Sequence, residues 1–228
     1  MYFRSRINNV TFTQNKYKEK EGASTFPYTP PKDNFTVEQI LDRQQEKFET
    51  DFLNVIYNFS INSKPILVDY VDSKMPYRDN NRNSKNLYTE QFLHLCSKEL
   101  HRDYSIPCQN IEPYNLCSGD NLTVVINNKI RAICLYRACR THWIPKILNL
   151  EKLNDSRVKL YLNEKENKIY CLYSDKLKKR NRYYVIIFKN LDNACKLITA
   201  YPVTVFKDIQ TIRKYKLIEK TDSAKRNP

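Results

Sequence analysis

The chain has 228 residues and a hydrophobic fraction of 41%, with 17 Tyr and 10 Phe, enough apolar surface for a folded core. Only two glycines, Gly22 and Gly119, occur, which excludes the glycine-rich phosphate loops of P-loop and dinucleotide-binding proteins. The formal net charge is +14, and residues 121–228 hold 24 Lys and Arg against 9 Asp and Glu, whereas residues 1–120 hold 15 against 16. Such a basic segment favours a polyanionic partner, because each neutralised phosphate releases condensed counterions.

The seven Cys are an odd number, and no apolar secretory signal precedes them. Free thiols in a reducing compartment fit best, so we expect an intracellular, cytoplasmic protein, located in a host cytoplasm or a virion if the source is viral. Few Gly with abundant Lys, Asn, Ile and Tyr is typical of the AT-rich genomes of many viruses, phages and parasites. No run reaches about 18 apolar residues, so we expect no membrane span.

The first half combines an arm with predicted helices. Residues 1–35 show no sustained period and are expected to form an extended arm. The sequence Thr36-Val37-Glu38-Gln39 has the spacing of a capping box and, with the apolar stripe that follows, predicts a helix over residues 36–58. A short strand over 66–71 and a second amphipathic helix over 88–102 follow. Residues 36–120 are therefore predicted to be mainly helical.

From Leu122 the pattern favours strands. Asn127-Asn128 is a hairpin turn between two apolar runs, of which the second, 130–136, could equally begin a helix, and a short helix is expected after Pro145. The other predicted elements are strands over 158–162, 169–173, 183–188 and 195–203 and a last helix over 206–217, before a flexible tail over 218–228. The prediction is an α+β fold in which helices pack on a small antiparallel sheet within a basic domain of residues 121–217.

Two segments, Arg182–Lys189 (RYYVIIFK) and Leu197–Pro202 (LITAYP), contain the most specific pattern in the chain. They resemble the end of the barnase–EndoU–colicin–RelE-like ribonuclease fold, especially its phage-encoded members, in which a helix bearing a His precedes a small antiparallel sheet. His142 stands where that pattern places its His, and the resemblance covers about residues 137–204. It implies metal-free RNA cleavage by attack of the ribose 2′-OH on the adjacent phosphate, with no cofactor and no metal ligands.

The resemblance also implies the catalytic residues. His142 is the expected acid or base, because the ordinary pKa of histidine lies near neutrality. Lys146, one helical turn later, would stabilise phosphate charge. Thr199 and Tyr201 share one face of the last strand and would hold the phosphate or the His, while Arg182 begins the adjoining strand.

The chain departs from the phage-type pattern around its His. Those members have an Arg-His pair that continues into Pro-Glu, whereas Thr141 here separates Arg140 from His142, and the acidic residue is missing. A protein that binds RNA without cleaving it is therefore an alternative. A structural His packed beside Trp143 is another.

The basic half also predicts a nucleic-acid-binding surface, because cations bind phosphates and exposed aromatic rings stack on bases. The candidate residues are Arg137, Arg140, Lys178, Lys179, Arg180, Tyr183, Lys189 and Lys196, and Tyr173 and Tyr184 are interleaved with them. Tyrosines on a sheet are frequently half-buried, and a basic face that is merely solvated is the other interpretation.

Cysteine and histidine residues occur in two groups, each of which could form a zinc site. These groups are His94, Cys96, His101, Cys108 and Cys117, and Cys134, Cys139 and His142. Neither contains a Cys-x-x-Cys pair or a His-x3-5-His pair, so buried free thiols are the favoured interpretation and no metal is expected.

These observations predict a protein that acts on RNA, in the first place a metal-independent endoribonuclease-like or toxin-like domain. The alternative is a non-enzymatic viral or phage nucleoprotein, or a transcription- or ribosome-associated protein that binds RNA or DNA. A protein–protein scaffold is a third hypothesis, and residues 1–120 are the segment through which a protein partner would bind.

Overall fold

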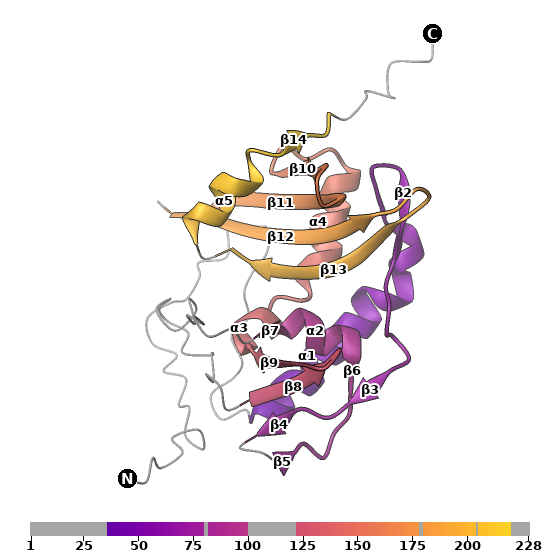
Figure 1. Ribbon diagram of the computed structural model, residues 1–228, viewed down its shortest axis with the longest axis vertical. Coiled ribbons are helices and arrows are strands. Elements are labelled where there is room, and N and C mark those ends of the chain that lie inside the picture. The colour runs from indigo at the N-terminus through magenta and orange to yellow at the C-terminus, as the bar shows by residue number, and fades with distance from the viewer. Residues whose placement is uncertain (1–35, 80–81, 100–121, 178–179, 204, 220–228) are drawn as a thin grey trace. The chain divides into compact units, whose positions relative to one another are not determined.

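A computed structural model describes residues 36–79, 82–99, 122–177, 180–203 and 205–219, and of residues 177, 180 and 181 it describes the backbone alone. The chain forms two compact units, each built from two stretches of sequence. The first unit combines Met1–Asn54 with Tyr70–Trp143, and the second combines Val55–Asp69 with Ile144–Pro228. Helices and sheets are both present, which confirms an α+β fold (Figure 1). None of the described helices is long and apolar enough to span a bilayer.

In its described part the first unit contains the helices α1 (Val37–Asp51), α2 (Glu90–Cys96) and α3 (Leu135–Ala138) and two small sheets. One sheet consists of β3 (Lys74–Met75) and β6 (Tyr88–Thr89). The strand order of the other is β5 (Arg82–Asn83), β4 (Arg78–Asp79), β8 (Leu122–Ile126), β9 (Lys129–Ile133) and β7 (Ser97–Glu99). The expected hairpin is confirmed, and Asn127 and Asn128 take the positive φ angles of 50° and 59° that its turn requires.

The mainly helical character predicted for residues 36–120 is not confirmed, because five short strands occur between residues 74 and 99. The helix predicted over 88–102 ends at Cys96 instead, and the next residues pair with β9 as the strand β7. The helix predicted over 36–58 ends at Asp51 and is followed by the 3-10 helix η2 (Leu53–Asn58). Residues 1–35, expected to form an arm, lie outside the described residues.

Helix α1 begins with the predicted capping box. The Thr36 side chain accepts a hydrogen bond from the Gln39 backbone N–H at 3.2 Å, and the Gln39 side chain accepts one from the Thr36 N–H at 2.9 Å. Replacing Thr36 by Ala should therefore lower the free energy of unfolding by about 1 kcal/mol, as measured by urea denaturation. Thr36→Ser, which retains the acceptor, is the control. An equal loss in both variants would contradict this assignment.

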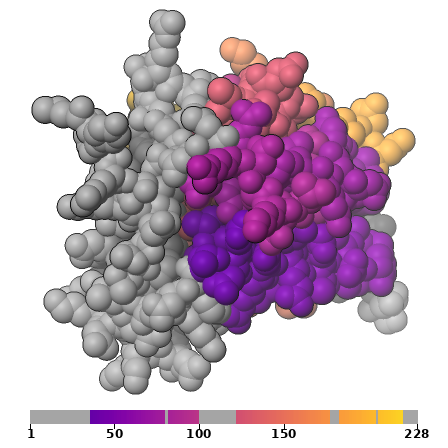
Figure 2. All heavy atoms as spheres, turned by 90° about the horizontal axis from the view of Figure 1, so that it is seen from below, coloured from indigo at the N-terminus to yellow at the C-terminus, as the bar shows by residue number. Residues whose placement is uncertain are grey.

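The apolar side of α1 forms the core of the first unit with α2. Phe48 lies with its ring centroid 5.6 Å from that of Phe52 and 5.9 Å from that of Phe92, and all three side chains are fully buried. The hydroxyl of Tyr88 donates a hydrogen bond to Asp42 at 2.7 Å. Figure 2 shows these segments side by side, with residues of α1 in indigo and those that lead into α2 in magenta.

The second unit is built on one seven-stranded sheet. Its order is β1 (Ser60–Ile61), β2 (Lys64–Leu67), β13 (Cys195–Pro202), β12 (Arg180–Asn190), β11 (Lys168–Leu177), β10 (Val158–Asn163) and β14 (Lys216–Leu217). The antiparallel meander of β10 to β13 is as predicted. The sheet is larger than the small antiparallel sheet expected, because β2 from the first half of the sequence joins parallel to β13 and β14 adds an edge.

Two helices cover the two faces of this sheet, α4 (Trp143–Lys152) and α5 (Phe206–Ile212) (Figure 1). Helix α5 is shorter than the predicted 206–217. On the α5 face, Ile209 and Ile212 of the helix pack with strand residues that include Leu172 and Val185. Residues one position along each strand, such as Cys171 and Ile186, are fully buried on the opposite, α4 face.

Candidate nucleic-acid interface

Three lysines lie in register across neighbouring strands on the α5 face of the sheet. Lys168 of β11 is directly opposite Lys189 of β12, and Lys189 is directly opposite Lys196 of β13. Lys168 and Lys189 are four residues from Leu172 and Val185, which pack against α5, and side chains an even number of positions apart on a strand share a face. Lys196 shares that face because it lies directly opposite Lys189. Neighbouring strands are about 4.8 Å apart, so the backbones that carry the three lysines of this lysine row span about 10 Å. Like charges placed directly opposite each other destabilise a sheet.

Acidic and carbonyl oxygens lie beside the lysine row. The Lys168 ammonium is 2.6 Å from a carboxylate oxygen of Glu166, and Lys189 donates a hydrogen bond to the Glu166 backbone carbonyl at 3.1 Å. Lys196 forms an ion pair with Asp69, which follows β2. The hydrogen bond from Lys168, with further attraction from Lys165 and Lys189, lowers the pKa of the Glu166 carboxyl. The site therefore has a surplus of positive charge around its acids.

The ion pairs of the row are accessible to solvent. The Lys168 and Glu166 side chains are 33% and 49% exposed, and those of Lys196 and Asp69 are 41% and 33% exposed. Exposed ion pairs typically contribute about 0–1 kcal/mol, so a phosphate oxygen can compete with a carboxylate for either lysine. Lys189 and Lys196 were predicted from the sequence as nucleic-acid-binding residues, whereas Lys168 was not.

Of the three tyrosines interleaved with the basic residues, Tyr183 alone is partly exposed. The Arg213 guanidinium, just after α5, lies 5.7 Å from the centroid of the Tyr183 ring. Tyr183 is two residues before Val185 on β12 and so belongs to the α5 face. Tyr173 and Tyr184 are at most 1% exposed and lie in the core, because each faces the α4 side of the sheet. Bases cannot stack on those two rings.

The residues predicted for catalysis are distributed over both units. His142 is 8% exposed and belongs to the first unit, whereas Lys146 is an exposed residue of α4 in the second. Thr199 and Tyr201 do share the α5 face, opposite Ile187 and Val185. Arg182 points to the α4 face, where it forms an ion pair with Asp175 at 2.9 Å. The sheet therefore separates Arg182 from Thr199 and Tyr201.

Arg137 and Arg140, which the sequence predicted as nucleic-acid contacts, make hydrogen bonds and ring contacts within the first unit. Arg137 donates a hydrogen bond to the Ser97 carbonyl at 2.9 Å. Arg140 is 4% exposed, and its guanidinium lies 3.6 Å from the centroid of the Tyr136 ring. Arg137 therefore links α3 to β7, whereas Arg140 contacts Tyr136, four residues earlier in the chain. Lys178, Lys179 and the Arg180 side chain lie outside what the structure describes.

Cys96, Cys134 and Cys139 lie close together in the first unit and are buried. Burial raises the pKa of the Cys96 and Cys134 thiols, with the other two thiols contributing at Cys96. Within the described ranges no group of three or more His, Cys, Asp and Glu side chains is arranged to hold a metal ion. His101, Cys108 and Cys117 lie outside those ranges.

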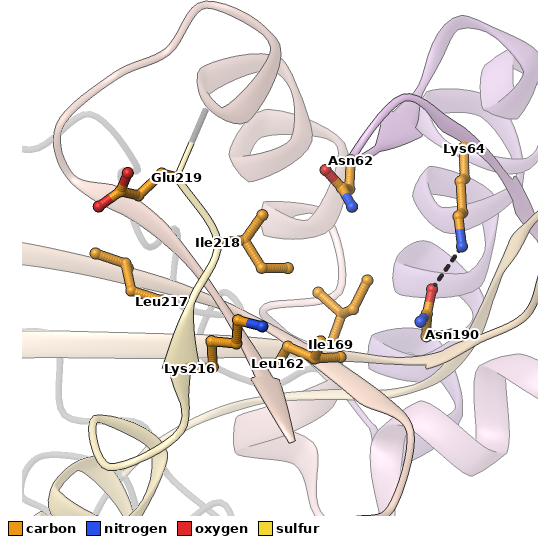
Figure 3. A pocket seen from close by; sticks show the side chains of 9 residues that line it. All are labelled: Asn62, Lys64, Leu162, Ile169, Asn190, Lys216, Leu217, Ile218 and Glu219. Carbon is orange, nitrogen blue, oxygen red and sulfur yellow. Dashed lines mark hydrogen bonds between the residues drawn. The ribbon is translucent and has the colours of Figure 1, made fainter. Parts of the chain in front are cut away.

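The second unit also contains a pocket of about 520 Å³, whose floor includes Leu162 and Ile169 (Figure 3). Lys64 at its rim donates a hydrogen bond to the Asn190 side chain at 3.0 Å, and Lys216 pairs with Glu164 at 2.9 Å. The remaining lining residues are Asn62, Leu217, Ile218 and Glu219. Glu164 and Glu219 balance the charges of Lys64 and Lys216 here, whereas the lysine row has three cations beside Glu166 and Asp69, so the lysine row is the better phosphate site.

Comparisons with known proteins found no matching family model, no matching curated protein and no matching solved structure.

Proposed function

We propose that the second unit binds RNA, along the α5 face of its sheet, without cleaving it. The lysine row is the observation that supports this function. Three cations held in register on a rigid sheet form a surface along which consecutive phosphates can lie, and the row's ion pairs are exposed enough to exchange.

The distribution of charge between the units supports the same ligand. The second unit has 21 Lys and Arg against 10 Asp and Glu, a balance of +11, whereas the first has 18 against 15, a balance of +3. A net charge concentrated in one unit raises the local concentration of a polyanion around that unit.

The positions of the predicted catalytic residues favour binding over cleavage. Cleavage through the ribose 2′-OH needs a base, an acid and cations around one phosphate. Arg182 lies on the face opposite Thr199 and Tyr201, and His142 is a buried residue of the other unit. The row supplies phosphate contacts, and the sequence of the second unit contains no His.

The test uses the full chain and a fluorescently labelled, single-stranded RNA in EDTA. We expect anisotropy to report binding that weakens steeply with salt, because each phosphate contact adds about 0.7 to the slope of log K against log[salt] for a single strand. We expect the RNA to stay intact on a denaturing gel. Formation of 2′,3′-cyclic phosphate ends would support the ribonuclease instead, and affinity that is insensitive to salt would exclude phosphate binding.

A further inference from the structure

Helix α5 presents an exposed aromatic ring beside cations. Phe206, its first residue, is 60% exposed, although Ile209 and Ile212 of the same helix are buried against the sheet. Arg213 follows Phe206 by seven residues, which places both on the same side of a helix. The Arg213 guanidinium lies 5.7 Å from the centroid of the Tyr183 ring, so the C-terminal end of α5 adjoins Tyr183, about 10 Å along the helix from Phe206.

This aromatic and cationic surface belongs to the same face of the sheet as the lysine row. Tyr183 and Lys189 are six residues apart on β12 and share the α5 face, which corresponds to about 20 Å along the strand. Tyr201, on the neighbouring β13, is half-buried on that face between them. Cations at one end of the strands and aromatic rings at the other are thus arranged along a single surface.

Lysine and arginine side chains accompany the exposed ring. Lys207 and Lys214 are exposed on or next to α5 and, with Arg213, outnumber the exposed Asp208, so the helix region has a net positive charge. An exposed apolar ring among cations is poorly suited to an apolar protein partner. It matches a nucleic acid, whose bases have apolar faces and whose backbone is anionic.

We propose that unpaired bases of the bound RNA stack on Phe206, so that the unit binds single strands in preference to duplex. This inference rests on the proposed RNA binding and names its substrate class. A duplex buries the faces of its bases in its own stack and can offer the same surface only phosphates, whereas a single strand offers both.

The test compares Phe206→Ala with the unsubstituted chain on an oligouridine of about 12 nucleotides and on an RNA duplex of the same length. We expect Phe206→Ala to weaken single-strand binding by about 5- to 100-fold and to leave duplex binding unchanged. Tyr57→Ala, which removes an 81% exposed ring elsewhere in the second unit, is the matched control and should change neither. Equal losses on both RNAs, or no loss, would overturn the inference.

Phe206→Trp provides a second measurement that does not depend on loss of binding. The chain has a single Trp, Trp143, which is 3% exposed, so the fluorescence added by this variant reports on position 206. Stacking should quench that fluorescence with the oligouridine and leave it unchanged with the duplex. If the oligouridine binds without quenching, stacking on Phe206 is refuted and the proposed RNA binding stands. If the unsubstituted chain binds no RNA, the proposed function is refuted as well.

Discussion

Replacing Lys168, Lys189 and Lys196 together by Gln should weaken binding of single-stranded RNA by about 50-fold at 0.15 M salt. The estimate follows from counterion release, because each lost phosphate contact removes about 0.7 from the slope of log K against log[salt], and three contacts remove about 2. Fluorescence anisotropy at several salt concentrations measures both quantities. The slope is the more diagnostic of the two, since a misfolded protein would lose affinity at every salt concentration.

A matched control separates the position of the lysines from the net charge of the chain. Lys74, Lys85 and Lys152 are also exposed, and none of them lies on the α5 face of the sheet. Replacing these three by Gln lowers the net charge by the same amount. We expect the salt slope of this control variant to stay within experimental error of the unsubstituted chain. Equal losses in the two triple variants would show that the charge acts diffusely and that the row is not the site.

The row variant should also remain folded. Lys189 lies between two other lysines, so the substitutions remove like-charge repulsion at the same time as they remove the exposed ion pairs with Glu166 and Asp69. These effects are small and opposite in sign. The urea unfolding free energy should therefore change by no more than about 0.5 kcal/mol.

Local patterns predicted the elements whose partners are adjacent in sequence. The turn at Asn127-Asn128 and the four strands β10 to β13 follow from alternation and turn residues, because each strand pairs with the next along the chain. The pairing of β2 with β13 joins residues about 130 positions apart. Nothing in either strand's own sequence indicates that partner, so the sheet was expected to be smaller. An apolar run such as that before Cys96 likewise could not show that β7 would replace the last helical turns.

The candidate site was predictable only in part, for a related reason. Lys189 and Lys196 are basic residues in a predicted hairpin, so residue type alone identified them. Recognising Lys168 as their neighbour requires the register of two hairpins, including the irregularity at Ile187 and Phe188. The same register places Arg182 on the face opposite Thr199. Residue types suggested a shared site, but the alternation of the strands separates these two side chains.

The position that we expect to affect stability most is Phe188, at that irregularity in β12. Its side chain is fully buried on the α4 face, between Ile169 of β11 and Leu197 of β13. Phe188→Ala removes this contact area and leaves a cavity, so the free energy of unfolding should fall by about 3–5 kcal/mol. Phe206→Ala, at the 60% exposed ring of α5, should cost far less and is the matched control.

Urea denaturation followed by circular dichroism measures this difference. Because domains are typically stable by only about 5–15 kcal/mol, Phe188→Ala should lower the unfolding midpoint greatly and should abolish binding of duplex RNA at temperatures where the control still binds the duplex. The two Phe→Ala variants should therefore differ in which RNAs they still bind. Phe188→Ala should lose affinity for single-stranded and duplex RNA together, because it unfolds the sheet, whereas Phe206→Ala should lose affinity for the single strand alone. If Phe188→Ala kept its midpoint, the lysine row could not be held by the sheet described here.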